Sequence, residues 1–198
     1  MYFNLELKKV GKLLIALCCA LMAFNFVACS NKDQSSDVSK LEFEDATELL
    51  TNIWDRENIN DKPNMVFGGI GETMVEEKPG AVDIAQKDSI EGVLYVPMDL
   101  ANSSTSGACV MNAIMANDFT ASAWQLKEDA DVDALQTQIE EKLKSAQWLC
   151  TFPEEYDIVV QDGFVVVVYG KTAQVGPFVE AAKLVMTNAE VTTGQFEA

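Results

Sequence analysis

Four acidic residues follow the spacing of a calcium-binding loop. At positions one, three, five and twelve of that template stand Asp129, Asp131, Asp133 and Glu140. Carboxylate oxygens at this spacing can wrap a calcium ion. Position six is Ala134, where the loop needs glycine. The apolar spacing also places Glu140 inside a helix, so we favour a second interpretation, an acidic helix start in which Asp129 or Asp131 accepts backbone N–H bonds.

Two cysteines, Cys109 and Cys150, lie in the body of the chain. A disulfide between them would close a loop of about 40 residues and add roughly 3 to 4 kcal/mol of stability in the chain-entropy model. Alternatively both are small buried hydrophobes, because Cys109 opens an apolar strand and Cys150 ends an amphipathic helix. Sequence spacing leaves both interpretations open.

The chain contains no histidine. It therefore lacks an imidazole base, a nitrogen ligand for zinc and the central member of a Ser/His/Asp or Cys/His system. No serine has a lysine three positions later, so the Ser-x-x-Lys pattern is missing as well. We predict no catalytic residue, cofactor or metal. Carboxylate chemistry on a glycan remains an alternative, with Trp124 and the cluster Glu72, Glu76 and Glu77 as its candidate parts.

The charge balance is strongly acidic, with 14 basic and 31 acidic residues and a net charge of −17. Such a surface repels phosphate backbones and anionic lipid headgroups, so we expect no binding to nucleic acid. Cationic ligands, metal ions and basic partners remain compatible with it.

Apolar spacing and turn residues predict the elements that would hold these side chains. Helices are expected over residues 39–56 and 132–146 and from Gly176-Pro177 onward, with a weaker one from Asp88 to Leu94 that Pro97 stops. Strands are expected over residues 65–67, 108–116, 119–126, 156–160 and 164–169, while residues 102–107 are interpreted as a loop.

Two consecutive hairpins, each followed by a helix, indicate the fold class. We predict an α+β domain with an antiparallel sheet of two or more hairpins and amphipathic helices packed on one face. Residues 164–169 form a continuous apolar run, which indicates a central strand buried on both faces. Asp162-Gly163 supplies the turn of the clearest hairpin.

The first residues resemble the export signal of a bacterial lipoprotein. Three lysines (Lys8, Lys9 and Lys12) precede an apolar run over residues 13–28, which ends in Phe26-Val27-Ala28-Cys29. Phe26 departs from the leucine usual at its position. The resemblance implies cleavage before Cys29 and a diacylglycerol on its sulfur. A retained membrane helix is the alternative, although the run is shorter than the roughly 20 residues that span a bilayer.

The resulting organisation has three parts: a signal peptide over residues 1–28, a flexible polar tether over residues 29–40 and a single domain over residues 41–198. Removing three lysines and one glutamate with the signal leaves 11 basic and 30 acidic residues, a net charge of −19.

The domain is also similar to an uncharacterised family of bacterial lipoproteins, known as a domain of unknown function. The resemblance is carried by the spacing of residues 132–143, by Pro153-Glu154-Glu155-Tyr156 and by the hairpin around Asp162-Gly163. It implies an exported, anchored α+β domain and no activity.

Three functions are compatible with these features. The first is a noncatalytic binding or interaction module, held by lipid on Cys29 at the extracytoplasmic face of the cell membrane, with an unknown envelope protein or ligand as partner. The alternative is an envelope enzyme that uses carboxylates on a glycan or peptidoglycan. A third is a structural factor that holds an envelope complex together.

Overall fold

Helix α2 (Ala46–Arg56) is the first helix in residues 40–58 and 61–197, the part of the chain that the computed structural model describes. Its N-terminus is capped by the Asp45 side chain, which accepts hydrogen bonds from the backbone N–H of Thr47 at 2.7 Å and Glu48 at 2.9 Å. The predicted start at Ser39 is wrong, because residues 40–45 are not helical. The predicted apolar face is confirmed and buries Ala46, Leu49, Leu50, Ile53 and Trp54.

Eight strands of the described chain form one antiparallel sheet. Its order is β2-β1-β4-β5-β7-β6-β8, and β3 pairs with β4 beside this path. The strands are β1 (Val66–Gly68), β2 (Val75–Glu76), β3 (Gly80–Val82), β4 (Ser104–Asn112), β5 (Phe119–Leu126), β6 (Glu155–Gln161), β7 (Phe164–Gly170) and β8 (Glu190–Gln195).

Strand β7 lies between β5 and β6, and all of its residues are buried. Asp162 and Gly163 make the β6–β7 turn with φ angles of 51° and 83°. Positive φ at both positions is what a two-residue hairpin requires, and Asp-Gly adopts it at low cost. The predicted hairpin and the central position of its second strand are therefore confirmed.

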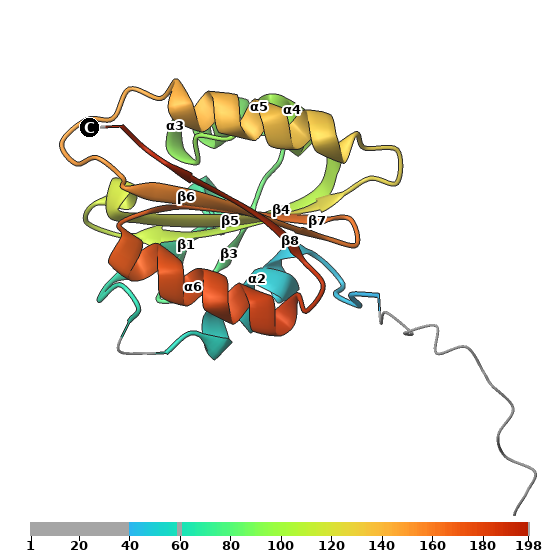
Figure 1. Cartoon of the computed structure of the whole chain (residues 1–198), viewed down its shortest axis with the longest axis horizontal. Coiled ribbons are helices and arrows are strands. Elements are labelled where there is room, and N and C mark those ends of the chain that lie inside the picture. The colour runs from blue at the N-terminus through green and yellow to red at the C-terminus, as the bar shows by residue number, and fades with distance from the viewer. Residues whose placement is uncertain (1–39, 59–60, 198) are drawn as a thin grey trace, which may run out of the picture. The chain divides into compact units, whose positions relative to one another are not determined.

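The α+β class with an antiparallel sheet is confirmed, but the helices cover both faces of the sheet and not one. Figure 1 shows α2 and α6 (Thr172–Val185) on one side, and α3 (Lys87–Val93), α4 (Met98–Asn102) and α5 (Val132–Lys144) on the other. The valines of β7 explain this arrangement: Val166 and Val168 join the core under α2 and α6, whereas Val165 and Val167 join the second core. Each face needs its own apolar cover.

The segment predicted as a loop over residues 102–107 is largely strand, since β4 begins at Ser104. Ser104 is buried, and its hydroxyl donates to the carbonyl of Leu100 at 2.6 Å. The hydroxyls of Thr105 and Ser106 donate to Oε1 of Gln125 on the paired strand β5 at 3.0 and 3.1 Å. A nearby carbonyl satisfies Ser104, and Gln125, about twenty residues away in sequence, satisfies Thr105 and Ser106.

Helix α6 starts at Thr172, so the predicted start at Gly176-Pro177 is wrong and Pro177 lies inside the helix. Glu154, which directly precedes β6, supplies the N-terminal partner, because its Oε2 accepts from the backbone N–H of Thr172 at 3.0 Å. Strand β8, which follows this helix, was not predicted.

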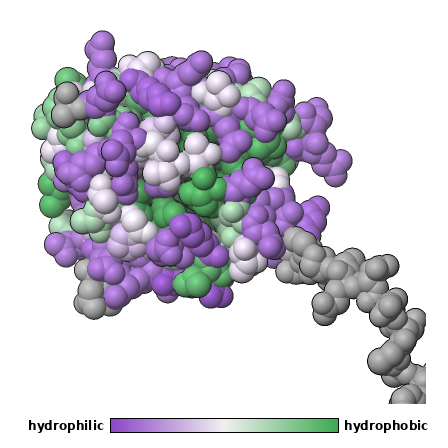
Figure 2. Space-filling model, viewed as in Figure 1, coloured by the Kyte–Doolittle hydropathy of each residue, from purple (hydrophilic) through white to green (hydrophobic). Residues whose placement is uncertain are grey.

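Contacts group Lys40–Ala198 into one compact unit. Figure 2 shows hydrophilic residues over most of the visible face, with smaller hydrophobic areas between them. Within the described ranges, no helix combines the length and the apolar character that a membrane crossing needs.

Candidate functional site

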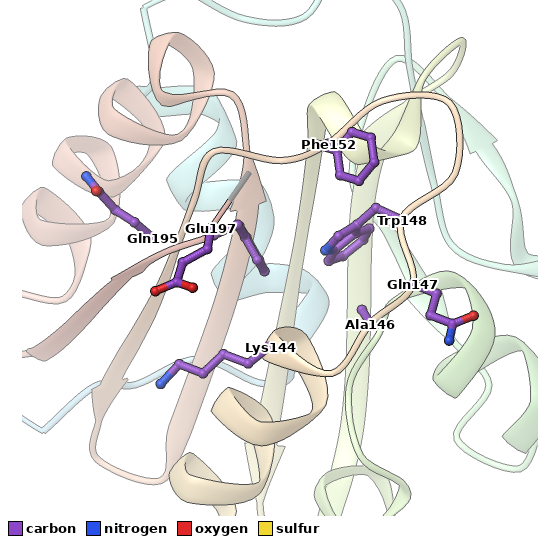
Figure 3. Close-up of a pocket in the computed structure, with 8 residues that line it drawn as sticks. Lys144, Ala146, Gln147, Trp148, Phe152, Gln195 and Glu197 are labelled. Atoms are coloured by element: carbon purple, nitrogen blue, oxygen red, sulfur yellow. The ribbon is translucent and has the colours of Figure 1, made fainter.

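A pocket of about 520 Å³ opens between the segment after α5 and the chain that ends β8. In Figure 3, Trp148 and Phe152 lie on the segment after α5, opposite Gln195 and Glu197. The complete lining is Lys144, Ala146, Gln147, Trp148, Phe152, Gln195, Phe196 and Glu197.

Aromatic rings in tilted and edge-to-face contact support the pocket wall. The centroid of Trp148 lies 4.5 Å from that of Tyr95, 5.2 Å from that of Tyr169 and 5.4 Å from that of Phe196. Phe196 in turn meets Tyr156 edge to face at 5.4 Å. These separations are typical of favourable aromatic pairs. The rings therefore hold a half-buried Trp148 in a fixed orientation at the pocket.

A polar cluster on α5 adjoins the aromatic wall. Oε2 of Glu140 lies 2.7 Å from Nζ of Lys144 and accepts the hydroxyl of Tyr156 at 3.1 Å. The hydrogen bond from Lys144 holds the pKa of Glu140 below its ordinary value of 4.5. Burial raises the pKa of Tyr156 above 10.0, so its phenol stays protonated. The cluster fixes the Tyr156 ring beneath the pocket.

Hydrogen bonds to backbone carbonyls hold the segment after α5. Nδ2 of Asn117 donates to the carbonyls of Leu149 and Thr151 at 3.1 and 3.0 Å, and Nζ of Lys171 donates to the carbonyl of Phe152 at 2.9 Å. Leu149 nevertheless exposes 77% of its surface and Phe152 exposes 59%. A segment anchored by its backbone thus presents apolar side chains to solvent beside the pocket, a feature of interaction sites.

The pocket lies at the end of the sheet opposite the first described residues. The backbone N–H of Leu41 donates to Oδ2 of Asp162, in the β6–β7 turn, at 3.0 Å. Strand β6 runs from Glu155, beside the pocket, to Gln161, beside that turn. Seven extended residues span roughly 20 Å, which separates the pocket from the point where the domain begins.

The four residues of the calcium template do not gather around one point. Asp131 caps α5, accepting the backbone N–H of Ala134 at 3.1 Å, whereas Glu140 is engaged with Lys144 and Tyr156. The helix-start interpretation is therefore confirmed for Asp131. In the described ranges there is no cluster of three or more acidic, cysteine or histidine side chains suited to a metal ion.

The two candidate disulfide partners are free thiols in this structure. Cys109 is buried in β4, whereas Cys150 is exposed on the segment after α5. Burial raises the pKa of the Cys109 thiol to about 12. The structure therefore does not have the disulfide, and Cys150 is not a buried hydrophobe.

The candidate residues of an envelope enzyme, Trp124 and the cluster Glu72, Glu76 and Glu77, do not meet in an open cleft. Trp124 is fully buried, and its ring nitrogen donates to the hydroxyl of Ser122 at 3.0 Å. Glu72, Glu76 and Glu77 are exposed around β2, at the far edge of the sheet from β8. A buried indole cannot stack on a sugar, so this combination does not form a glycan site.

The aromatic wall was not predicted from the sequence, because Trp148 was expected to be a buried residue near a helix end. The available signal was the stretch Trp148 to Phe152, which places three large apolar side chains on a non-helical segment before Pro153. Cys29, the predicted lipid attachment site, lies outside the described residues.

Comparisons with known proteins do not assign this chain to a family. No family model matches it, and no curated protein or solved structure matches it either. The resemblance to an uncharacterised lipoprotein family stays a prediction.

Proposed function

We propose that this chain is a lipoprotein held by lipid on Cys29 at the extracytoplasmic face of the cell membrane, and that its domain is a noncatalytic binding module. The pocket lined by Trp148, Phe152 and Phe196 is its binding site. The observation that carries the proposal is the pocket itself: an aromatic wall with ordered backbone, open to solvent, and flanked by two exposed apolar side chains.

The position of the pocket supports a binding role. The described part of the domain begins near the β6–β7 turn, because the backbone N–H of Leu41 donates to Asp162 in that turn. The pocket lies roughly 20 Å away at the other end of β6. The first described residues therefore leave the pocket uncovered.

The chemistry of the lining favours binding over acid–base catalysis. Among the described residues that line the pocket, Glu197 carries the one carboxylate and Lys144 the one cation. Glycoside hydrolysis uses two carboxyl groups, one on each side of the scissile bond. Aromatic faces beside a few polar groups are instead what ligand pockets use to orient a bound group.

The anchor is tested by metabolic labelling with a fatty-acid analogue. The wild type should carry the label in the membrane fraction, and Cys29→Ala should lose it while keeping its leader. Cys150→Ala is the matched control and should label like the wild type, because that thiol lies in the domain. Label retained in Cys29→Ala would overturn the anchor.

The pocket is tested by photocrosslinking in intact cells. A benzophenone amino acid replaces Phe152 in one variant and Glu128, an exposed residue after β5, in the control. We expect a discrete adduct from position 152 that disappears when Trp148→Ala is added, and none from position 128. Equal adducts from both positions, or an adduct independent of Trp148, would contradict a binding site here.

A further inference from the structure

Strand β8 forms one edge of the sheet with its outer side open. It pairs with β6 through six successive residue pairs, from Val160 with Glu190 to Glu155 with Gln195, without a register shift. Within the described chain, no strand or helix packs closely on its other side. Figure 1 shows β8 crossing in front of the other strands. Its outer backbone groups are thus available to a further strand.

This edge has few of the features that usually protect a sheet from added strands, since Glu190 is the one charged residue of β8. Natural edges are kept short, bulged, or marked by lysine and proline. The opposite edge follows this rule, because β2 has two residues. Strand β8 has six residues, with the sequence Glu-Val-Thr-Thr-Gly-Gln, and contains neither proline nor lysine. Its regular, unprotected edge is therefore suited to pairing.

The pairing with β6 indicates which backbone groups point outward. The N–H of Phe196 donates to the carbonyl of Glu154 at 3.0 Å. Hydrogen-bonded and non-hydrogen-bonded residues alternate along an antiparallel pair. The N–H and carbonyl groups of Gln195, Thr193 and Val191 therefore face away from β6, at the spacing that an added strand needs.

The open edge leads directly into the pocket. Gln195 ends β8, and Phe196 and Glu197 continue the chain along the pocket wall. A strand added along β8 would therefore carry one of its side chains toward the pocket that Phe196 and Trp148 line. The edge supplies backbone hydrogen bonds and the pocket supplies side-chain selection.

The negative charge of the domain determines which kind of strand β8 would bind. Residues 40–198 contain 28 acidic and 10 basic residues, a net charge of −18. Glu190 and Glu197 flank the edge, and Glu155 lies opposite Gln195 on β6. A second copy of this domain brings the same negative charge and is repelled, whereas a cationic segment is attracted.

We propose that β8 binds an extended, basic polypeptide segment by β-strand addition, with an aromatic or aliphatic side chain of that segment in the pocket. The proposal rests on the proposed binding function and names its ligand class. Recognition then combines main-chain hydrogen bonds to Val191, Thr193 and Gln195 with burial of one side chain against Trp148.

The test uses the full chain in detergent and the capped hexapeptide Lys-Val-Lys-Val-Lys-Phe. Hydrogen exchange read by mass spectrometry should show slower exchange over residues 190–196 when the peptide is added. The same peptide methylated on alternate backbone nitrogens should bind at least about tenfold more weakly, since it cannot pair. A Glu-Val-Glu-Val-Glu-Phe peptide should also bind at least about tenfold more weakly because of like charge.

Two substitutions at one position separate the edge from its side chains. Thr193→Pro removes an outward N–H and should weaken peptide binding about tenfold or more. Thr193→Val keeps that N–H and loses only the hydroxyl that bonds Asp157, so it should bind like the wild type. Equal unfolding midpoints in the two variants show that Thr193→Pro retains the fold, and the methylated peptide tests the edge without any substitution.

Several results would overturn the strand-addition proposal. These are equal binding of the methylated peptide, equal binding of the acidic peptide, and no binding of the basic peptide at concentrations up to about 1 mM. Protection over residues 190–196 that rises with protein concentration alone would identify a second copy as the occupant. Trp148→Ala separates the two proposals. If Thr193→Pro loses peptide binding and Trp148→Ala does not, the edge binds the peptide and the pocket does not. If only Trp148→Ala loses peptide binding, the pocket binds the peptide and the edge does not.

Discussion

Gly194 on β8 lies directly opposite Tyr156 on β6, and the Tyr156 ring occupies the space above the glycine. A Cβ at position 194 would lie 2.1 Å from Cζ of that ring. Two contacts hold the ring in this position: Phe196 packs against it and Glu140 accepts its hydroxyl. Glycine at this position thus allows the edge strand, α5 and the pocket wall to meet.

Gly194→Ala should therefore displace the Tyr156 ring and destabilise the domain. Overpacking of a tightly filled site costs about 1 to 3 kcal/mol, and we expect a loss of that size in urea unfolding. The displaced ring should also weaken binding at the pocket, since it supports Phe196.

Gly92→Ala is the matched control for this prediction. Gly92 lies in α3, where an added Cβ meets nothing within 4 Å. Alanine should leave stability unchanged or raise it by up to about 1 kcal/mol, because it favours the helix. An unchanged unfolding midpoint in Gly194→Ala would contradict the contact between Gly194 and Tyr156.

Glu57 should make the stability of the domain depend on pH. It ends α2 with 5% of its surface exposed, and its two carboxylate oxygens have no hydrogen-bond partner among the described residues. Burial raises its pKa from 4.5 to about 7, against the attraction of Lys62. The raised pKa stabilises the fold below pH 4.5, and this contribution is lost as the pH rises through about 7.

Glu57→Gln should remove this loss. Between pH 5 and 8 the free energy of unfolding of the wild type should fall by about 2 kcal/mol more than that of the variant. Asp55→Asn, which changes an exposed acid two residues earlier in the chain, is the control and should follow the wild type. Parallel profiles for wild type and Glu57→Gln would show that the Glu57 carboxyl is solvated.

Patterns of neighbouring residues were sufficient to predict several elements of the fold. The Asp162-Gly163 turn, the unbroken apolar run of β7 and the apolar stripe of α5 each follow from neighbouring residues. They also predicted that two hairpins would pair in an antiparallel sheet.

The misplaced elements depend on partners distant in sequence. Helix α6 starts at Thr172 because Glu154 accepts its N–H, a contact that no local pattern near Pro177 reveals. Strand β8 carries Gly194 because of Tyr156, almost forty positions earlier in the sequence, and glycine lowers any prediction of a strand. The pocket joins α5, its following segment and β8, so it could not be predicted before β8 was known.

Asp131 should stabilise α5 without a metal ion. Its side chain accepts the N–H of Ala134, and loss of such a cap costs about 1 kcal/mol. Asp131→Ala should therefore lower the free energy of unfolding by that amount, equally in calcium chloride and in a chelator. Asp129→Ala is the control and should change stability by less than about 0.5 kcal/mol. Calcium that raises the unfolding midpoint of the wild type but not of Asp131→Ala would restore the loop interpretation.

Cys109 and Cys150 should differ sharply in reactivity. Cys150 is exposed and should react with maleimide in the folded protein, whereas Cys109 is buried, and burial raises its thiol pKa to about 12. Cys109 should react after denaturation, and peptide mapping of the full chain assigns each label. Cys150→Ser should leave the slow labelling of Cys109 and the unfolding midpoint unchanged, because no bond joins the two residues in this structure. A peptide that links both cysteines, together with a loss of stability in Cys150→Ser, would show that the protein forms the disulfide.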